Sequence, residues 1–385
     1  MIPKMNQFDV AVVGLGALGS AATFHASLKG VKVIGIEQYE LGHVRGASHD
    51  TSRIVRTSYG EHEYVALAKS AYKDWAHLEE KCGQRLLTQT GGIVFFPENG
   101  PMSARDFANS LTANDIPHEL LSAQEVNKRW PQFNIPSSVT TVYTADTGIV
   151  HAARSTMAMQ SQARANGAIL KENTQVFQVV PSVGSRGVVI ETSNGPFFAT
   201  KVIIAADAWL NKLLAPLDAV IPLSIMQEQV SYYKPTDMAS FEQGHFPVWI
   251  WEDEPCYYGF PTYGEPTIKA ARDVANNFMT PEQRTFVHSP QLLKELTEFM
   301  AHLVPGKGQV LRTVTCQYAI TPSRQLVISS LERYDNIFVG LGCGQGFKFA
   351  PAIGRILAEL AIDGKTDDNI SKFGIPKLER TTSKI

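Results

Sequence analysis

Strand-like and helix-like hydrophobic patterns alternate at the start of the chain. Residues 8–13 form a short continuous apolar run, which is typical of a strand buried on both faces of a parallel sheet. The apolar residues of 17–29 predict a helix that ends at Gly30, and residues 31–36 predict a second strand that stops at Glu37. This order predicts a βαβ unit and therefore an α/β fold with a Rossmann-like parallel sheet.

The same two patterns recur along the rest of the chain. Ser122 and Glu125 have the spacing of a capping box that opens a short helix. Helix-spaced apolar residues predict four longer helices, at residues 63–81, 151–166, 290–303 and 348–362. Short alternating segments predict an antiparallel meander added to the parallel sheet, at residues 168–170, 175–180, 187–191 and 201–205. A returning strand is expected at 336–339.

Aromatic-rich strands are expected between residues 219 and 310, at 230–233, 246–251 and 256–260. This change to aromatic-rich strands indicates a second domain, a mixed-sheet α+β substrate domain inserted into the first. At 385 residues the chain is long enough for two domains. We expect the dinucleotide-binding domain to comprise residues 1–90, 145–218 and 311–385, and the substrate domain to comprise residues 91–144 and 219–310.

Composition and charge narrow the classes of partner. The chain is 44% apolar and 19% charged, with a net charge of −2, so nothing in it favours a nucleic-acid partner or a polybasic membrane contact. The four cysteines are widely spaced and form no CxxC pair, which is typical of free thiols in a reducing compartment and gives no metal site: Cys82, Cys256, Cys316 and Cys343.

Targeting signals are weak. No apolar run approaches the roughly 18 residues of a membrane span, and the N-terminal residues lack a signal-peptide core. The chain ends in Ser383-Lys384-Ile385, which is close to the Ser-Lys-Leu peroxisomal address. We therefore expect a cytoplasmic protein, or a peroxisomal one if the source is eukaryotic.

Gly14, Gly16 and Gly19 form a GxGxxG motif between the first strand and the first helix, and Glu37 follows about 20 residues later. In this setting the first glycine allows the turn, the second lets the backbone approach a pyrophosphate, and the third lets helix pack on strand. Glu37 can accept hydrogen bonds from ribose hydroxyls, which argues against a 2′-phosphate. The motif predicts dinucleotide binding but does not separate NAD from FAD.

Other candidate residues are ambiguous when taken singly. Arg53 and Arg56, three residues apart, could face one site and bind a carboxylate, or could form a solvated basic turn. Cys316 alone would usually be a buried apolar residue, and Lys269 and Lys348 alone would be exposed lysines. Residue type therefore leaves both interpretations open.

Taken together, these segments resemble in order and spacing the monomeric sarcosine oxidase family, which includes N-methyltryptophan oxidase, pipecolate oxidase and the fructosyl-amine oxidases. The resemblance covers nearly the whole chain. It is carried by the following segments: Gly14–Gly19 with Glu37, Gly46–Arg56 with Tyr59-Gly-Glu61, Tyr257–Pro261, Lys269, Cys316–Tyr318 and Gly344–Lys348.

The resemblance implies FAD as the cofactor and assigns roles by position. Cys316 matches the cysteine that links covalently to the flavin 8α-methyl group. Lys269 matches the lysine above the flavin that promotes reaction with O₂, where a fixed ammonium stabilises developing negative charge. Arg56 and Lys348 match the pair that holds the substrate carboxylate, one as a planar fork and one as a point charge.

Further positions match residues around the substrate and the cofactor. Tyr258, Tyr318 and Glu61 match residues that line the substrate pocket. His49 and Arg53 match positions close to the flavin ring. Cofactor contacts are also expected from the remaining motif residues: Gly14, Gly16, Gly19, Glu37, Ser52, Gly344, Gly346, Phe347 and Lys348.

Four departures from the family pattern lie near the expected site. Gln345 and Asp273 each stand where relatives usually carry histidine. Asp207 replaces the glycine of an Ala-Gly-Ala-Trp segment, and Ser48–Ser52 replaces a His-His-Gly-Asp-Thr run. These departures question sarcosine as the substrate more than they question the reaction class.

The resemblance implies FAD-dependent oxidation of the C–N bond of a secondary amino acid (N-methyl, cyclic or N-substituted) to an imine. O₂ would be the acceptor, H₂O₂ the product and the enzyme a monomer. One alternative is a dehydrogenase of the same fold with another acceptor, which the retention of Lys269 disfavours. A dinucleotide-binding protein without turnover is the other, and it would leave Cys316, Lys269 and Lys348 without a common explanation.

Overall fold

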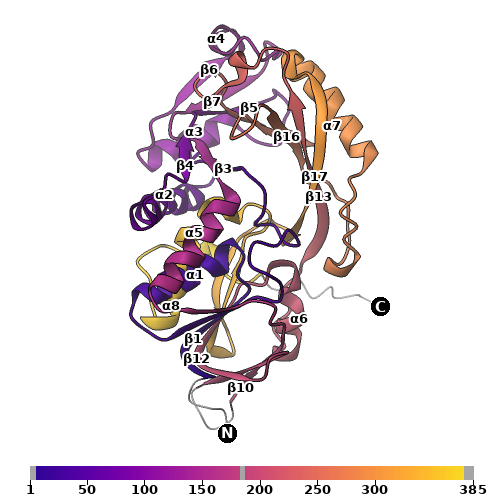
Figure 1. Ribbon diagram of the computed structural model, residues 1–385. Coiled ribbons are helices and arrows are strands. Elements are labelled where there is room, and N and C mark those ends of the chain that lie inside the picture. Colours follow the sequence, from indigo (N-terminus) through magenta and orange to yellow (C-terminus); the bar gives the residue numbers. More distant parts are fainter. Residues whose placement is uncertain (1–5, 183–186, 377–385) are drawn as a thin grey trace, which may run out of the picture.

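Two eight-stranded sheets form the framework of the molecule, one beyond the other along its long axis (Figure 1). The structure is a computed structural model that describes residues 6–182 and 187–376. The expected targeting residues Ser383-Lys384-Ile385 lie outside the described residues. The predicted class, a Rossmann-like α/β sheet with a second mixed sheet, is confirmed.

The first sheet has a parallel centre flanked by antiparallel strands. Its main order is β10-β11-β12-β1-β2-β9, with β19 paired to β12 and β18 to β19. The strand bounds are β1 Gln7–Val13, β2 Val33–Ile36, β9 Ile169–Lys171, β10 Val176–Pro181, β11 Val188–Thr192, β12 Phe197–Ile204, β18 Val327–Leu331 and β19 Tyr334–Leu341. From Val10 to Val13 every residue of β1 is buried, because neighbouring strands and helices cover it.

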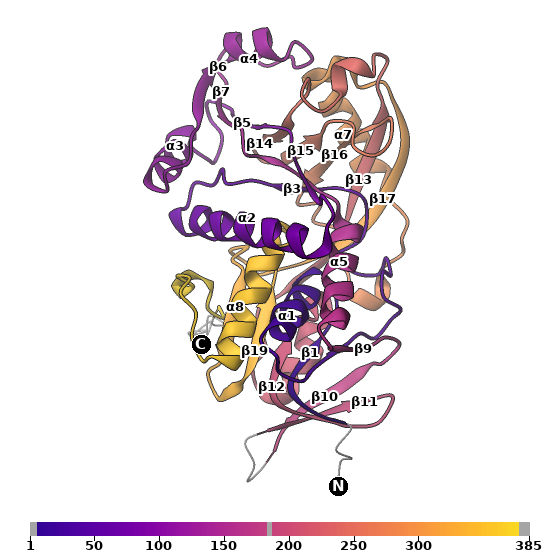
Figure 2. The same ribbon diagram turned by 60° about the vertical axis from the view of Figure 1, so that its left-hand side comes forward.

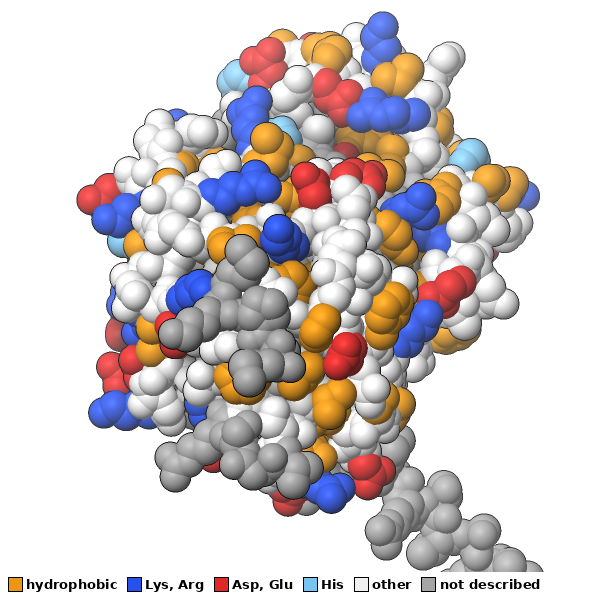
Figure 3. Space-filling view, turned by 60° about the horizontal axis from the view of Figure 1, so that its bottom comes forward, with side chains coloured by type: hydrophobic (Ala, Val, Ile, Leu, Met, Phe, Trp, Pro, Cys, Tyr) orange, Lys and Arg blue, Asp and Glu red, His pale blue; other side chains and the backbone are white. Residues whose placement is uncertain are grey.

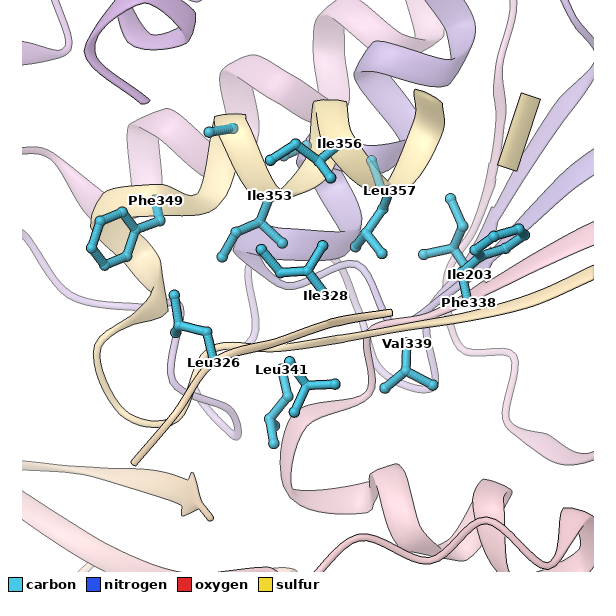
Figure 4. Packing of buried hydrophobic residues seen from close by; sticks show 14 of the residues in the cluster. Ile203, Leu326, Ile328, Phe338, Val339, Leu341, Phe349, Ile353, Ile356 and Leu357 are labelled. Atoms are coloured by element: carbon cyan, nitrogen blue, oxygen red, sulfur yellow. The ribbon is translucent and has the colours of Figure 1, made fainter. Parts of the chain in front are cut away.

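Helices α1 (Ala17–Leu28), α5 (Ala152–Ala165) and α8 (Ala350–Ile362) lie together against this sheet (Figure 2). Ile353 and Leu357 of α8 pack over Ile328 of β18, whereas Val339 of β19 points to the opposite face of the sheet (Figure 4). Helices α1 and α8 approach closely at Gly354, where an added Cβ would lie 2.4 Å from the Cβ of Ala21. All three helices were predicted from apolar spacing.

Two of the four predicted meander segments, 168–170 and 201–205, belong to the parallel sheet. Residues 201–204 form the end of β12, which pairs in parallel with β1 and β19. β9 pairs in parallel with β2, through Ile34↔Ile169 and its neighbours, so it extends the parallel sheet and is not part of the antiparallel ribbon. Only β10 and β11 form that ribbon, and β11 pairs antiparallel with the start of β12. The sequence prediction was wrong for β9 because three half-exposed residues carry no signal of strand direction.

The second sheet is mostly antiparallel, in the order β17-β13-β16-β15-β14-β5-β7-β6. Its strand bounds are β5 Gly92–Phe96, β6 Glu119–Ser122, β7 Thr140–Thr144, β13 Ser224–Lys234, β14 Val248–Trp251, β15 Cys256–Phe260, β16 Ile268–Asp273 and β17 Gln309–Ile320. Helix α7 (Pro290–Leu303) runs along one side of it (Figure 1) and buries Leu296, Met300 and Leu303. Phe299 of α7 stacks on Tyr257 at 3.9 Å between ring centroids.

Strand β17 corrects the expected domain boundary at residue 311. It pairs with β13 from Gln309 to Ile320, and therefore belongs to the second sheet along its whole length. The prediction placed most of this strand in the dinucleotide-binding domain. Long-range pairing with β13 decides its position, and no local pattern encodes that pairing.

Smaller elements connect the two sheets. A three-stranded sheet of β3 (Arg53–Val55), β8 (Gly148–Val150) and β4 (Leu87–Gln89) lies between them. The remaining helices are α2 His62–Cys82, α3 Ala104–Ala113, α4 Ala123–Arg129 and α6 Leu210–Leu214. The predicted capping box of α4 is present: the Ser122 hydroxyl accepts from the Glu125 amide, and the Glu125 carboxylate accepts from the Ser122 amide.

Acidic and basic side chains are interspersed on the face seen in Figure 3, in keeping with the small net charge. Within residues 6–182 and 187–376, none of the helices combines the length and apolarity that a membrane crossing needs.

Candidate active site

A cavity of about 650 Å³ runs between the two large sheets and gathers most of the residues that the sequence singled out. Side chains alternate across a strand, so residues two apart point the same way. Three strands of the second sheet each line the cavity through such alternating residues: Cys256, Tyr258 and Phe260 of β15, Lys269 and Asp273 of β16, and Val314, Cys316 and Tyr318 of β17.

The glycine motif forms the cavity wall at the edge of the first sheet. Gly14 has φ +90°, and an added Cβ would lie 2.6 Å from the carbonyl oxygen of Ala205. A Cβ on Gly19 would overlap the Gly14 carbonyl oxygen at 1.7 Å, so this position admits no side chain without movement of the backbone. Gly16 is the N-cap of α1 and has no side chain, and the first turn of the helix lines the cavity, which directs its positive end toward a bound phosphate.

Glu37 lies at the end of β2, buried beside the glycine turn. One oxygen accepts from the Leu15 amide at 2.8 Å and the other from the Tyr39 amide at 3.2 Å. His43 approaches the second oxygen at 3.4 Å. A carboxylate has about four acceptor positions, so Glu37 can still accept from ribose hydroxyls.

Two buried polar atoms in the cavity wall fit an additional bound group. His49 Nε2 and Asp207 Oδ2 are both shielded from solvent and have no hydrogen-bond partner within the described part of the chain. Burial lowers the pKa of His49 to about 4, with Arg53 adding to the effect, and burial raises the pKa of Asp207 to about 7. Unpaired polar atoms of this kind are costly unless a ligand or water satisfies them, so the cavity fits a dinucleotide cofactor.

Lys269 lies in the middle of the cavity, with only 3% of its surface exposed. Its Nζ donates to Asp50 Oδ2 at 2.7 Å, to the Ser52 carbonyl oxygen at 3.0 Å and to Ser52 Oγ at 3.1 Å. The structure therefore brings the predicted Lys269 and Ser52 together. It adds Asp50, which the sequence analysis did not single out.

Cys316 lies on β17 and its thiol is buried in the cavity wall. Burial raises the pKa of Cys316 to about 11, although the nearby cations Arg53, Arg284 and Lys269 oppose this effect. Arg284 fixes the adjacent backbone by donating to the Thr315 carbonyl oxygen at 2.6 Å. The four predicted residues His49, Ser52, Arg53 and Cys316 thus line one part of the cavity.

Arg56 and Lys348 both line the cavity, and both lie close to the ring of Tyr59. The Arg56 guanidinium lies 4.4 Å from the Tyr59 ring centroid, and Lys348 Nζ lies 5.8 Å from it. Lys348 Nζ donates to the Gln345 carbonyl oxygen at 3.0 Å. Burial and the neighbouring Arg56 hold the pKa of Lys348 well below its usual range, so this cation gains stability from a bound anion.

Two acids accompany these cations, and the sequence analysis gave neither of them a role. Glu252 Oε1 lies 3.7 Å from Arg56 Nη2, and burial raises the pKa of Glu252. Asp273, noted only as a departure, pairs with Arg324. Gln345, the other departure, donates through Nε2 to the Arg324 carbonyl oxygen at 3.2 Å. Asp273 and Gln345 are thus both in contact with Arg324.

Tyr258 and Tyr318 both line the cavity, and both interact with Cys316 and Asp273. Burial raises the pKa of both phenols above their usual range, so both hydroxyls are neutral donors at physiological pH. Gly344 has φ +74°, and a Cβ there would lie 2.7 Å from the Tyr318 ring, so glycine permits this close packing. Gly346 and Phe347 also line the cavity.

Glu61 is the predicted site residue that the structure does not bring to the cavity. It is exposed at the N-cap of α2, and its carboxylate forms an ion pair with Lys372. Its place just before the helix turns the side chain toward solvent. Its expected place in the substrate pocket is therefore wrong, and Glu252 is the acid that lies beside Arg56.

Ser48 is a further residue that the sequence analysis missed. Its hydroxyl accepts from the Ala17 amide at 2.9 Å, and a Cβ on Gly16 would lie 3.0 Å from it. The available signal was that Ser48 directly precedes the candidate residue His49. The partner of Ser48, Ala17, lies 31 residues away in the sequence, so no local pattern indicated this hydrogen bond.

Known proteins resemble this chain along nearly its whole length. The profile of the family described as FAD dependent oxidoreductase matches residues 9–360. Monomeric sarcosine oxidase of Bacillus sp. (strain NS-129) is 31% identical over 378 residues, covering 96% of this chain and 97% of that protein. N-methyl-L-tryptophan oxidase of Yersinia pestis (strain Pestoides F) is 29% identical, with 96% and 99% covered.

Among solved structures, NikD, described as an unusual amino acid oxidase essential for nikkomycin biosynthesis, superposes with a TM-score of 0.85 over 96% of this chain and 98% of its own, at 24% identity. That similarity concerns the fold. The chain belongs to the FAD-dependent oxidoreductase family, among the flavin amine oxidases that include the monomeric sarcosine oxidases.

Proposed function

We propose that this protein oxidises the C–N bond of a secondary amino acid to an imine, with O₂ as electron acceptor and H₂O₂ as product. The observation that carries the proposal is one cavity that begins at the glycine turn, passes Lys269 and Cys316, and includes the two cations Arg56 and Lys348. Two relatives are named for N-methylated amino acids, sarcosine and N-methyl-L-tryptophan, which supports this substrate class.

The cofactor contacts are assigned as follows. The glycine turn would bind the diphosphate of FAD, and Glu37 would bind a ribose. Cys316 would hold the flavin through a thioether that replaces its S–H and one C–H of the 8α-methyl group, with the two electrons passing to the flavin and on to O₂. Supporting observations are the N-terminus of α1 in the cavity wall, the buried carboxylate at the end of β2 and the cavity-lining thiol of β17. FAD, when bound, supplies the two-electron acceptor for the amine.

The residues of the chain bind and orient the substrate. Arg56 and Lys348 hold its carboxylate, one through a planar guanidinium and one through an ammonium. Tyr258 and Tyr318 form aromatic walls that exclude water, which favours the neutral amine that can give up two electrons. Lys269 presents a fixed positive charge where O₂ is reduced, and such preorganised charges stabilise an anion as it forms.

The test is a screen of N-methyl, cyclic and N-carboxyalkyl amino acids for flavin bleaching without O₂ and for peroxide formation with O₂. Bleaching followed by rapid reoxidation and one H₂O₂ per amine supports the proposal. Bleaching without reoxidation by O₂ would show a dehydrogenase, and a colourless protein would exclude both.

A matched variant separates the two half-reactions. Lys269→Met should slow reoxidation by O₂ by about 10²–10³-fold while anaerobic reduction by the amine changes far less. Equal slowing of both steps would contradict a specific role of Lys269 in the reaction with O₂.

A further inference from the structure

Asp50 is in direct contact with Lys269 and is bound from several sides. Its Oδ2 accepts from Lys269 Nζ at 2.7 Å, and Arg53 Nη1 lies 3.7 Å from the same oxygen. Its Oδ1 accepts from the Tyr232 hydroxyl at 2.6 Å. The side chain is 10% exposed and lines the cavity, so these contacts form away from bulk water.

The backbone at Asp50 is strained. Its φ is +81°, in the left-handed region that glycine adopts at little cost and other residues avoid. Strained residues of this kind persist where the surrounding structure holds them, and they cluster at functional sites. Glycine would adopt this φ more easily than aspartate, but it would not provide a carboxylate for Lys269.

The buried Lys269 ammonium needs a counter-ion. Arg53 is the cation that acts on Lys269, and His49, which interacts with Arg53 and Arg284, also lines the cavity. The groups facing Lys269 from its neighbouring strands are the Tyr232 and Phe260 rings, with centroids 5.6 and 4.9 Å from Nζ, and the Cys316 thiol. Asp50 is thus the one carboxylate bound to this ammonium within the described chain.

We propose that Asp50 is a positioning residue for the oxygen half-reaction, which holds Lys269 in its charged form and fixes it in the cavity. The inference rests on the proposed function, since it assigns O₂ to Lys269. It predicts that a neutral residue at position 50 turns off the oxygen reaction at neutral pH and spares it in acid.

The titration of Lys269 agrees with this geometry. Burial lowers the pKa of Lys269 to about 8, and the Asp50 carboxylate opposes that effect, whereas Arg53 adds to it. Without Asp50 the pKa of Lys269 should fall further, so the fraction of charged lysine at pH 7 should fall as well.

The experiment follows reoxidation of chemically reduced holoprotein by O₂ in a stopped-flow instrument between about pH 5 and 9. No amine is added, so the result does not depend on the substrate. The wild-type rate should fall as the pH rises through about 8. In Asp50→Asn the fall should occur about two pH units lower, so that the rate at pH 7 is reduced roughly tenfold and is recovered near pH 5.

Matched variants exclude a merely structural effect. Asp50→Gly relieves the strained φ but lacks the charge, so its profile should shift like that of Asp50→Asn. Asp50→Glu keeps the charge and should retain reoxidation at pH 7. Asp74→Asn, which breaks the ion pair with Arg355 outside the cavity lining, should leave the profile in place.

A second measurement needs no turnover. The Nζ signal of ¹⁵N-lysine-labelled protein, assigned by its loss in Lys269→Met, should titrate at lower pH in Asp50→Asn than in the wild type. An unchanged Nζ titration, or reoxidation at pH 7 that is as fast or faster in Asp50→Asn, overturns the proposal. A wild-type flavin that O₂ does not reoxidise at all would instead reject the proposed acceptor, and the Nζ titration would still test the ion pair.

Discussion

The guanidinium of Arg324 meets the carboxylate of Asp273 at two points, with Nη1–Oδ2 at 3.0 Å and Nη2–Oδ1 at 3.1 Å. Both residues line the cavity that contains Arg56 and Lys348. Arg324 has φ +57° on the turn after β17, and Gln345 holds its carbonyl oxygen. Chain segments more than 50 residues apart thus place an extra ion pair beside the proposed carboxylate site.

This ion pair should set the electrostatic potential felt by the substrate carboxylate. Asp273→Asn removes a negative charge and should tighten binding of a carboxylate inhibitor roughly threefold to tenfold, because it relieves the repulsion between two carboxylates and leaves the charge of Arg324 unpaired. Arg324→Gln should weaken the same inhibitor by a similar factor. Titration of the flavin spectrum measures both. Weakening in both variants would mean that the pair only holds the turn in place.

Arg56 and Lys348 should each contribute strongly to carboxylate binding. Removing one partner of a desolvated charge pair costs roughly 2–5 kcal/mol, so Arg56→Ala and Lys348→Ala should weaken substrate and carboxylate inhibitor alike. An amine without a carboxylate should lose little. The two effects should be non-additive, because in the proposed site both cations contact one carboxylate.

The control for charge removal is Arg272→Ala, since Arg272 pairs with Glu295 and does not line the cavity. It should leave inhibitor affinity unchanged. If affinity survives in both Arg56→Ala and Lys348→Ala, the carboxylate binds elsewhere and the amino-acid substrate class loses its main support.

Covalent attachment through Cys316 predicts that acid-precipitated protein stays yellow and gains the mass of one FAD. Cys316→Ser should release the flavin into the supernatant. Cys256→Ser is the matched control, because Cys256 lines the same cavity and should have no part in attachment. Flavin released from the wild type would contradict the assignment.

Glu228 should make stability depend on pH. It is buried on β13 opposite Cys316, and burial raises the pKa of Glu228 to about 8, with Asp273 adding to the effect. Because the pKa is higher in the folded state, the stabilising contribution is complete below about pH 4.5 and is lost as the pH rises through about 8. The loss is on the order of 4 kcal/mol.

Glu228→Gln keeps an acceptor for the Ala275 amide, which the carboxylate now binds at 3.1 Å, and removes the titration. Its Tm should therefore exceed that of the wild type near pH 8 and approach it near pH 5. Parallel Tm profiles for the two proteins would show that Glu228 does not titrate in this range.

Local patterns predicted the elements well where neighbours in sequence decide the structure. The apolar spacing of 290–303 gave the bounds of α7, and Ser122 and Glu125 form the expected capping box. The glycine motif carries its own steric signature, because Gly14 and Gly19 lie where a Cβ has no room. These features depend on residues a few positions apart.

The remaining features depend on contacts between distant segments. β17 joins the second sheet through β13, and Asp50 reaches Lys269 across 219 positions. Neither a propensity nor a family motif encodes such pairs. Glu61 is an example of a family motif that misled the prediction. The motif placed Glu61 in the substrate pocket, but as the N-cap of α2 its side chain is exposed to solvent.

Residues of both large sheets line the cavity, so a bound cofactor would contact both sheets. The glycine turn and Glu37 belong to the first sheet, whereas Cys316 and Lys269 belong to the second. A cofactor bound by residues of both sheets would stabilise the position of one sheet relative to the other. Loss of FAD would then weaken the contact between the two sheets as well as abolish activity. Resistance to proteolysis should therefore correlate with flavin content.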